Sequence, residues 1–288
     1  MNDTIKVTEA KHLFMGDGLI HPDYTLYRVD GGDVRWYFCP DDDTYYPSVT
    51  SVIGATTPTP YGLLVWMKKH GENADAMRDE RAAYGTALHN LVERMLLGMS
   101  VTGADIANSM KAIELETGPK PQAQLAAFSR ELRKDLLSFV QFAQDVSLEP
   151  VAVEIMLRGD GYAGAADIVG YVNGELSIVD IKSGKKGFYE SHEIQLHMYK
   201  AAWDELYPDL PIQKVYNFSP KDWRKKPTYT LKDQTKSTSA AKIPLLLKLF
   251  SMSDHKPPTL LDFDGAINLD SNVESLYEFT DIKSRVSH

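Results

Sequence analysis

The stretch from Gly161 to Tyr199 decides the fold expected for this chain, because it holds two short apolar segments, a turn and a helical pattern in that order. The first segment reads IVGYV over 168–172 and the second reads LSIV over 176–179, with Asn-Gly at 173–174 between them. β-Branched runs on either side of an Asn-Gly pair are typical of a β-hairpin with a tight turn. The stretch therefore predicts two antiparallel strands followed by a helix.

Charged residues lie where the two strands of this hairpin end. Asp167 precedes the first apolar segment, and Asp180-Ile181-Lys182 follows the second, so the turn brings Asp167 opposite Asp180. Asp180 and Lys182 share one face of the strand while Ile181 points to the other. Two carboxylates this close repel each other unless a cation lies between them, and Mg²⁺ suits such a pair together with phosphate oxygens. The pattern favours metal-dependent phosphodiester hydrolysis, in which a lysine helps to activate water.

The Asp-x-Lys triplet does not identify a catalytic site by itself; the residues before and after it do. An acidic residue two positions before a lysine occurs four times in the chain, and Asp281-Ile282-Lys283 even repeats the tripeptide. Only Asp180-Ile181-Lys182 follows a Gly-x-x-Asp hairpin and precedes a helical pattern. In that pattern Gln195 and Tyr199 are four residues apart, so they are neighbours on one helix face.

These residues carry a family resemblance. Gly164-x-x-Asp167, Asp180-x-Lys182 and Gln195-x-x-x-Tyr199, in this order, resemble the PD-(D/E)xK nuclease superfamily and specifically its RecB-type exonuclease branch. Gly85-x-x-x-His89 resembles an upstream motif of that branch. The segment at 47–50, Pro-Ser-Val-Thr, is similar to one near the start of such nucleases, including the mitochondrial genome maintenance exonuclease and stand-alone phage exonucleases. Ala166 stands where the superfamily name has proline.

The resemblance implies roles for individual residues. One or two Mg²⁺ or Mn²⁺ ions would be bound by His89, Asp167, Asp180 and the Ile181 carbonyl, and Lys182 would orient or deprotonate the attacking water. Gln195 and Tyr199 would surround the site. Glu154 has the position, thirteen residues before Asp167, of an acidic residue often found in the family's site. A lone glutamate on a strand can equally face solvent, and both interpretations stay open.

Candidate DNA contacts lie in three places. In relatives the Pro-Ser-Val-Thr segment and the histidine helix form a passage for a single strand, which makes Ser48 and Thr50 candidates. Lys185 and Lys186 directly follow the catalytic strand. A basic stretch with an aromatic residue inside it can contact phosphates and stack on a base, although it can also be an ordinary charged hairpin loop; its candidates are Lys221, Trp223, Arg224, Lys225 and Lys226.

Composition narrows the class of protein. The net charge of −9 disfavours a purely electrostatic DNA-binding protein, so any contact with DNA must use local basic patches. Cys39 is the single cysteine, which excludes the iron-sulfur cluster carried by some RecB-type relatives. The sequence contains no membrane-spanning apolar run and no signal-peptide pattern at its start, so we expect a cytoplasmic location without membrane contact. A recombination or single-strand-binding protein is a possible partner besides DNA.

The expected fold class is α/β, with a restriction-endonuclease-like core. A small mixed sheet would be formed by 151–157, 162–172, 175–181 and 212–218, with helices at 81–97, 122–146, 188–206 and 235–252. The helix that carries His89 should cross the mouth of the sheet. We expect one nuclease domain over 1–288, with an N-terminal strand and loop region (1–60), a helical part (61–146), the catalytic sheet core (147–232) and a C-terminal helix and tail (233–288).

The function expected from these features is metal-dependent exonuclease action at DNA ends, in recombination, repair or phage DNA metabolism. The preference for exonuclease over structure-specific endonuclease rests on the resemblance. A catalytically silent nucleic-acid-binding or scaffold protein and a hydrolase of small phosphoesters remain as alternatives. The intact Asp167, Asp180 and Lys182 argue against the first of these, and the basic stretch at 221–226 argues against the second.

Overall fold

The central element of the computed structural model is a five-stranded mixed sheet in the order β5-β6-β7-β8-β9. The structure describes residues 6–9, 18–30, 34–184, 187–258, 261–262 and 280–281, with the backbone alone at 6–9, 261–262 and 280–281. The strands of this sheet are β5 (Glu149–Gly159), β6 (Tyr162–Val172), β7 (Glu175–Ile181), β8 (Lys214–Pro220) and β9 (Tyr229–Asp233).

The predicted hairpin is β6 and β7. They pair antiparallel from Val172↔Glu175 to Ile168↔Val179, and the turn residues Asn173 and Gly174 both have positive φ, 51° and 81°. Two consecutive positive φ values are the conformation that makes Asn-Gly a favoured hairpin turn. The chain then crosses over through α6 (Glu190–Leu206) so that β8 runs parallel to β7, as a parallel pair requires.

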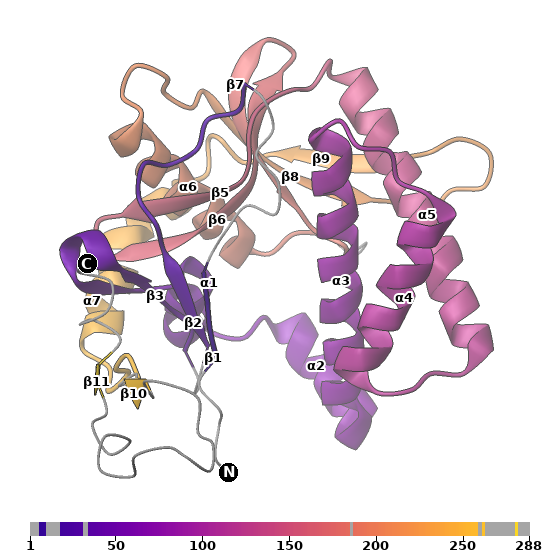
Figure 1. Ribbon diagram of the computed structural model, residues 1–288, viewed down its shortest axis with the longest axis horizontal. Helices are drawn as coiled ribbons and strands as arrows, with labels where there is room; N and C mark the ends of the chain where they lie inside the picture. Colours follow the sequence, from indigo (N-terminus) through magenta and orange to yellow (C-terminus); the bar gives the residue numbers. More distant parts are fainter. Residues whose placement is uncertain are drawn as a thin grey trace, which may run out of the picture.

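Helices cover the two faces of this sheet and create two hydrophobic cores (Figure 1). On one face, α6 packs on Ile178 and Val215 together with α1 (Val49–Thr56). On the other face, Val179, Ile181 and Phe218 contact the helical part of the chain. That part consists of α3 (Ala74–Leu96), α4 (Gly103–Thr117) and α5 (Gln122–Asp145), which lie side by side in Figure 1. Strand β7, which carries Asp180, therefore lies between two layers of helices.

The remaining elements form the N-terminal region and the C-terminal helix. Four antiparallel strands precede α1, and α7 packs beside that helix. These elements are β1 (Lys6–Glu9), β2 (Tyr27–Asp30), β3 (Trp36–Cys39), η1 (Pro40–Asp42), β4 (Thr44–Pro47), α2 (Tyr61–His70), η2 (Gly71–Asn73), η3 (Thr238–Lys242), α7 (Ile243–Ser251), β10 (Leu261–Asp262) and β11 (Thr280–Asp281).

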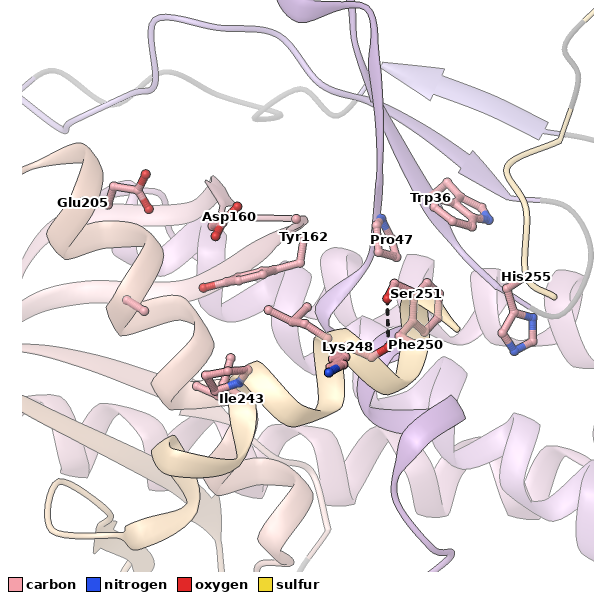
Figure 2. A pocket seen from close by; sticks show the side chains of 14 residues that line it. Trp36, Pro47, Asp160, Tyr162, Glu205, Ile243, Lys248, Phe250, Ser251 and His255 are labelled. Atoms are coloured by element: carbon pink, nitrogen blue, oxygen red, sulfur yellow. Dashed lines mark hydrogen bonds between the residues drawn. The ribbon is translucent and has the colours of Figure 1, made fainter. Parts of the chain in front are cut away.

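A cavity of about 730 Å³ lies between this N-terminal sheet, the β5–β6 turn, α6 and α7 (Figure 2). Its walls include Trp36, Tyr162, Leu247 and Phe250. Among the residues that the structure describes, none of the site residues predicted from the sequence lines it. In the described ranges, no helix combines the length and the apolar character needed to cross a membrane.

The α/β class and the mixed sheet are confirmed, and the differences from the expected elements have physical causes. Helix α3 begins at Ala74 instead of 81, because its first two turns are mostly exposed and leave no apolar periodicity to read. The helix expected over 235–252 is divided into η3 and α7, because Pro244 lies in the first turn of α7, where a proline starts a helix. Strand β9 adds a fifth member to the predicted sheet.

Candidate active site

Asp167 and Asp180 lie at the open end of the β6–β7 hairpin. They occupy the position next to Ile168↔Val179, the last paired residues, where the two strands separate. Asp167 accepts a hydrogen bond from the backbone N–H of Ile181, at 2.6 Å. The side chains are nearly inaccessible, with Asp167 8% and Asp180 1% exposed, and this burial raises the pKa of both carboxyls. Two buried carboxyls of this kind call for a compensating positive charge.

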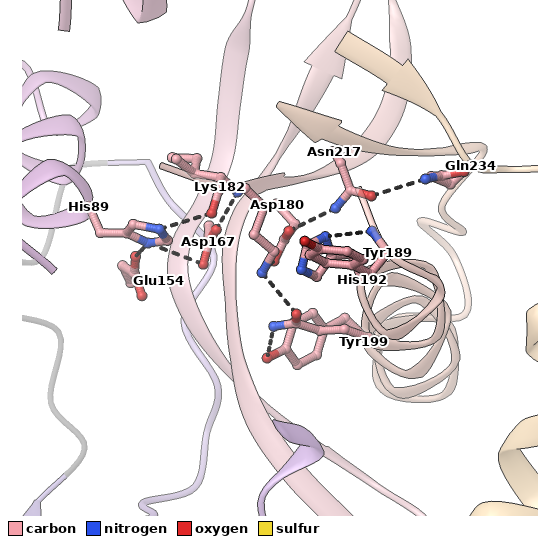
Figure 3. Close-up of polar contacts among 12 residues, drawn as sticks. His89, Glu154, Asp167, Asp180, Lys182, Tyr189, His192, Tyr199, Asn217 and Gln234 are labelled. Carbon is pink, nitrogen blue, oxygen red and sulfur yellow. Dashed lines mark hydrogen bonds and ion pairs between the residues drawn. The ribbon is translucent and has the colours of Figure 1, made fainter. Parts of the chain in front are cut away.

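His89 reaches the same place from helix α3 (Figure 3). Its Nε2 atom lies 3.0 Å from the Ile181 carbonyl oxygen, and its Nδ1 atom lies 3.6 Å from Asp167 Oδ1. Burial alone would lower the pKa of His89, but the charges of Asp167 and Glu154 outweigh it and raise the pKa to about 9. The expected crossing of this helix over the mouth of the sheet is thus observed.

The glycine of Gly-x-x-x-His has a steric reason. Gly85 lies one turn before His89, and a Cβ atom added there would be 3.2 Å from Ser183 Oγ, just after the catalytic strand. A side chain at this position would push the Ser183 hydroxyl aside, so glycine favours the close approach of helix α3 to the end of β7. The motif brings the backbone close at Gly85 and the imidazole close at His89.

Glu154, whose role the sequence left open, points into the site. It lies on β5, and its Oε1 atom is 3.6 Å from His89 Nδ1. Its φ is 48°, a left-handed conformation that costs a non-glycine residue about 1 kcal/mol or more. A regular strand would turn successive side chains to alternate faces, and this departure occurs at the strand position beside Asp167. The site thus includes an acidic residue held in a strained conformation.

Three side chains form a group suited to a metal ion. Ligand atoms of His89, Glu154 and Asp167 all lie within 4.8 Å of one another. One imidazole and two carboxylates are donors that divalent cations accept, and the carboxylates favour ions such as Mg²⁺ and Mn²⁺. Asp180 is not one of these three residues; its Oδ1 atom accepts a hydrogen bond from Lys182 Nζ at 2.9 Å and its Oδ2 atom accepts one from Asn217 Nδ2 at 2.8 Å. Glu154 thus joins His89 and Asp167 in this group, and the role of Asp180 as a further ligand stays a prediction.

Lys182 is held between the catalytic strand and helix α6. Its Nζ atom donates to Asp180 Oδ1 and to Gln195 Oε1, both at 2.9 Å. Gln195 in turn donates from Nε2 to the Tyr199 hydroxyl at 3.2 Å. The glycine of Gly-x-x-Asp belongs to the same contact, since a Cβ at Gly164 would lie 3.0 Å from Tyr199 Cε1. The three motifs therefore meet in one place, as their order in the sequence predicts.

The N-terminal DNA candidates differ in exposure. Ser48 is only 2% exposed, and its hydroxyl caps helix α1 by accepting from the Ser51 N–H at 3.0 Å. This burial removes Ser48 from contact with a substrate, and its expected role is corrected to that of a helix cap. Thr50, two residues later, is exposed. Lys185 and Lys186 lie outside the described residues.

The basic loop is the connection between β8 and β9. Its cationic side chains are exposed: Lys221, Arg224, Lys225 and Lys226. Trp223 is partly covered, because Lys134 on α5 donates from Nζ to the Trp223 carbonyl at 2.8 Å and places its ammonium 5.1 Å from the ring centroid. The loop is a hairpin loop in form, and one face of its tryptophan is engaged with α5.

Four residues near the site were not found from the sequence. Asn217 on β8 and Gln234, which directly follows β9, are buried polar residues; Gln234 donates to Asn217, and Asn217 donates to Asp180. His192 lies one turn before Gln195 on α6, and burial and the positive charge of Lys182 lower its pKa to about 4. Glu93 is 7% exposed and lies one turn after His89, where the i to i+4 spacing was a usable signal.

Helix α2 has an unusual surface for its composition. It contains no buried residue, and Tyr61, Leu64 and Val65 are 81%, 49% and 49% exposed. Its last turn carries Lys68 and Lys69, for which the described part of the chain provides no ion pair. Residues 57–70 include no acidic side chain, in a protein whose net charge is −9. Apolar and basic side chains are thus exposed together next to the start of α3.

Comparison with known proteins supports the interpretation of this geometry. A search of curated proteins finds no match to the chain. A family model described as the PD-(D/E)XK nuclease superfamily matches residues 64–254, well over half of the chain, and this range includes His89, Asp180 and Tyr199. The five-stranded mixed sheet between helices is consistent with the restriction-endonuclease-like core of that superfamily. From the matched range, the fold and the convergence of the motifs, we conclude that this chain belongs to the PD-(D/E)XK nuclease superfamily, a superfamily of metal-dependent nucleases.

Proposed function

We propose that this protein is a Mg²⁺- or Mn²⁺-dependent deoxyribonuclease of the RecB-type branch that hydrolyses phosphodiester bonds at DNA ends. The observation that carries the proposal is the convergence of His89, Glu154 and Asp167 beside Lys182. Recombination, repair or phage DNA metabolism would be the setting for such an activity.

The metal would be held by His89, Glu154 and Asp167, with Asp180 and the Ile181 carbonyl adjacent to them. The ion would supply positive charge to the phosphate oxygens and lower the pKa of water. Asp167 is kept in orientation by the Ile181 N–H, and His89 by the Ile181 carbonyl, so one residue of the catalytic strand aligns two of the ligands.

Lys182 supplies the second positive charge. With Asp180 and Gln195 as its partners, its ammonium is directed along the face of the sheet that carries the carboxylates. There it orients the attacking water or a phosphate oxygen by donating a hydrogen bond, and offsets the negative charge that develops on phosphorus oxygens. Gln195 and the Tyr199 hydroxyl restrict the position of the ammonium, which is the role of residues around a catalytic group.

The path of the DNA would follow exposed cationic side chains. Helix α2 meets the first turn of α3, and the sixteen residues from Ala74 to His89 cover about 22 Å of helix. A strand lying along α3 would contact the lysines of α2 at one end and the metal ligands at the other, with bases stacking on exposed apolar side chains such as Tyr61. Thr50 and the loop at 221–226 are further candidates for contact.

The experiment that tests this function is cleavage of linear and circular DNA, each single- and double-stranded, with 5′ or 3′ label in Mg²⁺ and Mn²⁺. Loss of linear substrate alone would establish exonuclease action and its polarity, whereas cutting of circles would establish an endonuclease with the same site. Asp180→Asn keeps the size of the side chain and should abolish cleavage. Lys182→Ala should abolish it while sparing the fold and metal binding. The proposed function is wrong if no nucleic acid is cut under any of these conditions.

A further inference from the structure

A line of buried amides leads away from Asp180 (Figure 3). Asn217 donates from Nδ2 to Asp180 Oδ2 at 2.8 Å, and Gln234 donates from Nε2 to Asn217 Oδ1 at 3.2 Å. Asn217 is 0% and Gln234 4% exposed. A buried amide without partners costs roughly 1–3 kcal/mol, so polar side chains at these positions need a compensating interaction.

The direction of each donor in this line follows from chemistry. An ionised carboxylate can only accept hydrogen bonds, so Asn217 must present its NH₂ group to Asp180. Its carbonyl then faces Gln234, which must present an NH₂ group of its own. Gln234 is fixed at the backbone, where its N–H donates to the Val215 carbonyl at 2.9 Å and its carbonyl lies 3.1 Å from His197 Nε2. The line therefore has one orientation, in which each amide donates toward Asp180.

We propose that Asn217 is a positioning residue for Asp180 and that Gln234 sets the orientation of its amide. Asp180 and Asn217 are directly paired in the register of the parallel strands β7 and β8. With Oδ2 held by Asn217, the Asp180 carboxylate plane is fixed and Oδ1 is directed at Lys182. The inference rests on the proposed nuclease function, because it makes the line of amides the means by which the sheet places the catalytic ammonium.

The test is Gln234→Glu, which reverses the line. A glutamate carboxylate accepts only, so it would draw the Asn217 NH₂ group toward itself and turn the Asn217 carbonyl against Asp180. We expect kcat to fall by about 10–100-fold, the range typical of residues that orient ligands, with KM for DNA unchanged. Gln234→Met removes the orienting donor without reversing it, and a smaller loss is expected.

Gln213→Glu is the control for the added charge, at an exposed position, whereas Gln234 is buried. It places the same new charge just before β8, at the far end of the same strand pair, and keeps the oxygen that accepts from the Leu176 N–H at 2.9 Å. Its kcat should equal that of the unchanged protein. Melting curves of each metal-free variant establish that it is folded at the assay temperature.

A pH profile separates positioning from a structural role. Once protonated, the carboxyl group introduced by Gln234→Glu again donates to Asn217, so the kcat of this variant relative to the unchanged protein should recover as pH falls through the pKa of that carboxyl, which burial raises above its ordinary value. The titratable groups around position 234 are His197 on α6, Asp233 with its partner Lys214, and Lys232 with its partner Glu193. They are identical in the Gln213→Glu control, whose ratio should stay constant.

The orientation of the Asn217 amide can be measured by NMR on the metal-free protein, without any DNA cleavage. The Asn217 side-chain NH₂ pair can be assigned in ¹⁵N spectra by its absence from Asn217→Ser, and it should shift in Gln234→Glu and not in Gln213→Glu. If the unchanged protein cuts DNA and folded Gln234→Glu has the same kcat and pH profile, the positioning role is wrong. If the unchanged protein cuts nothing, the proposed function fails instead, and an unmoved Asn217 signal would overturn the orientation as well.

Discussion

The carboxylate of Glu154 lies 3.6 Å from the imidazole of His89, measured from Oε1 to Nδ1. The two residues come from different layers, Glu154 from strand β5 and His89 from helix α3. Glu154 reaches this position with a φ of 48°. Strain at such positions is maintained when the surrounding structure demands it, and active sites are where it collects. We therefore propose that Glu154 is one of the metal ligands.

Glu154→Gly separates the stability of the strand from metal binding. Glycine adopts positive φ without cost, so the free energy of unfolding should be about 1 kcal/mol higher than that of Glu154→Ala, which loses the same carboxylate but keeps the backbone strain. Affinity for Mn²⁺, measured by calorimetry, should fall at least about tenfold. Glu154→Asn, which also tolerates the left-handed conformation, should show the same loss of affinity. Unchanged Mn²⁺ affinity in both variants would remove Glu154 from the metal group.

Gly164→Ala tests the contact between two motifs. The added Cβ would lie 3.0 Å from Tyr199 Cε1 and 3.3 Å from Val49 Cγ2, in a region that is fully packed. Overpacking of this kind costs about 1–3 kcal/mol, and denaturant unfolding should report it together with reduced cleavage through displacement of Tyr199. Gly184→Ala is the control, because a Cβ there meets no atom within 4 Å. Equal stability of the two variants would contradict the proposed packing.

Much of this site could be predicted from the sequence because its motifs are local. The hairpin, its Asn-Gly turn and the i to i+4 pair on α6 depend on spacing along the chain, and β6 and β7 have the predicted bounds. Glu154 points into the site because its backbone has positive φ, and no glycine or proline next to it in the sequence predicts that conformation. Asn217 lies beside Asp180 because β8 pairs with β7 after the chain has crossed over through α6. Both the conformation of Glu154 and the pairing of Asn217 with Asp180 depend on the tertiary structure, which the spacing of residues in one sequence does not predict.

The expected DNA contacts also depend on exposure in the tertiary structure, which the sequence alone does not predict. The hydroxyl of Ser48 matched a motif, but its position at the N-terminus of α1 makes it a cap. The exposed apolar face of α2 escaped notice, because an apolar helical pattern normally indicates a buried helix. Exposure of Tyr61, Leu64 and Val65 is a property of the tertiary structure alone.

Glu93→Gln should remove a pH dependence of stability. Burial and the negative charge of Glu154 raise the pKa of Glu93 from 4.5 to about 7. The folded state then holds a proton that the unfolded state releases, so this group lowers stability as pH rises from about 4.5 to 7, and the penalty persists above that. The variant should be more stable than the unchanged protein at pH 8, by at most about 3 kcal/mol, and equal to it at pH 4. Chemical denaturation at the two pH values measures this; a constant difference would contradict it.

The double variant Lys68→Glu/Lys69→Glu should weaken DNA binding. Each lysine that contacts a phosphate releases a counterion, so the loss of two should lower the slope of log K against log salt by about 1.4–1.8, depending on the form of DNA. Fluorescence anisotropy in Ca²⁺ with single-stranded oligonucleotide provides the measurement. Lys111→Glu/Lys248→Glu changes net charge equally on α4 and α7. If both double variants give the same slope, α2 does not contact the DNA.

The central claim is that a divalent ion bound at His89, Glu154 and Asp167 is required for phosphodiester cleavage, and Asp167→Asn tests it most directly. Asparagine keeps a carbonyl oxygen that can accept the hydrogen bond from the Ile181 N–H, so the hairpin end is preserved while the ligand charge is lost. Mn²⁺ binding by calorimetry and cleavage of labelled linear DNA are followed in parallel with the unchanged protein. We expect cleavage to begin over the Mn²⁺ concentrations at which the ion binds, and both to be lost in the folded variant. Cleavage by Asp167→Asn at the rate of the unchanged protein would contradict the assignment of this site.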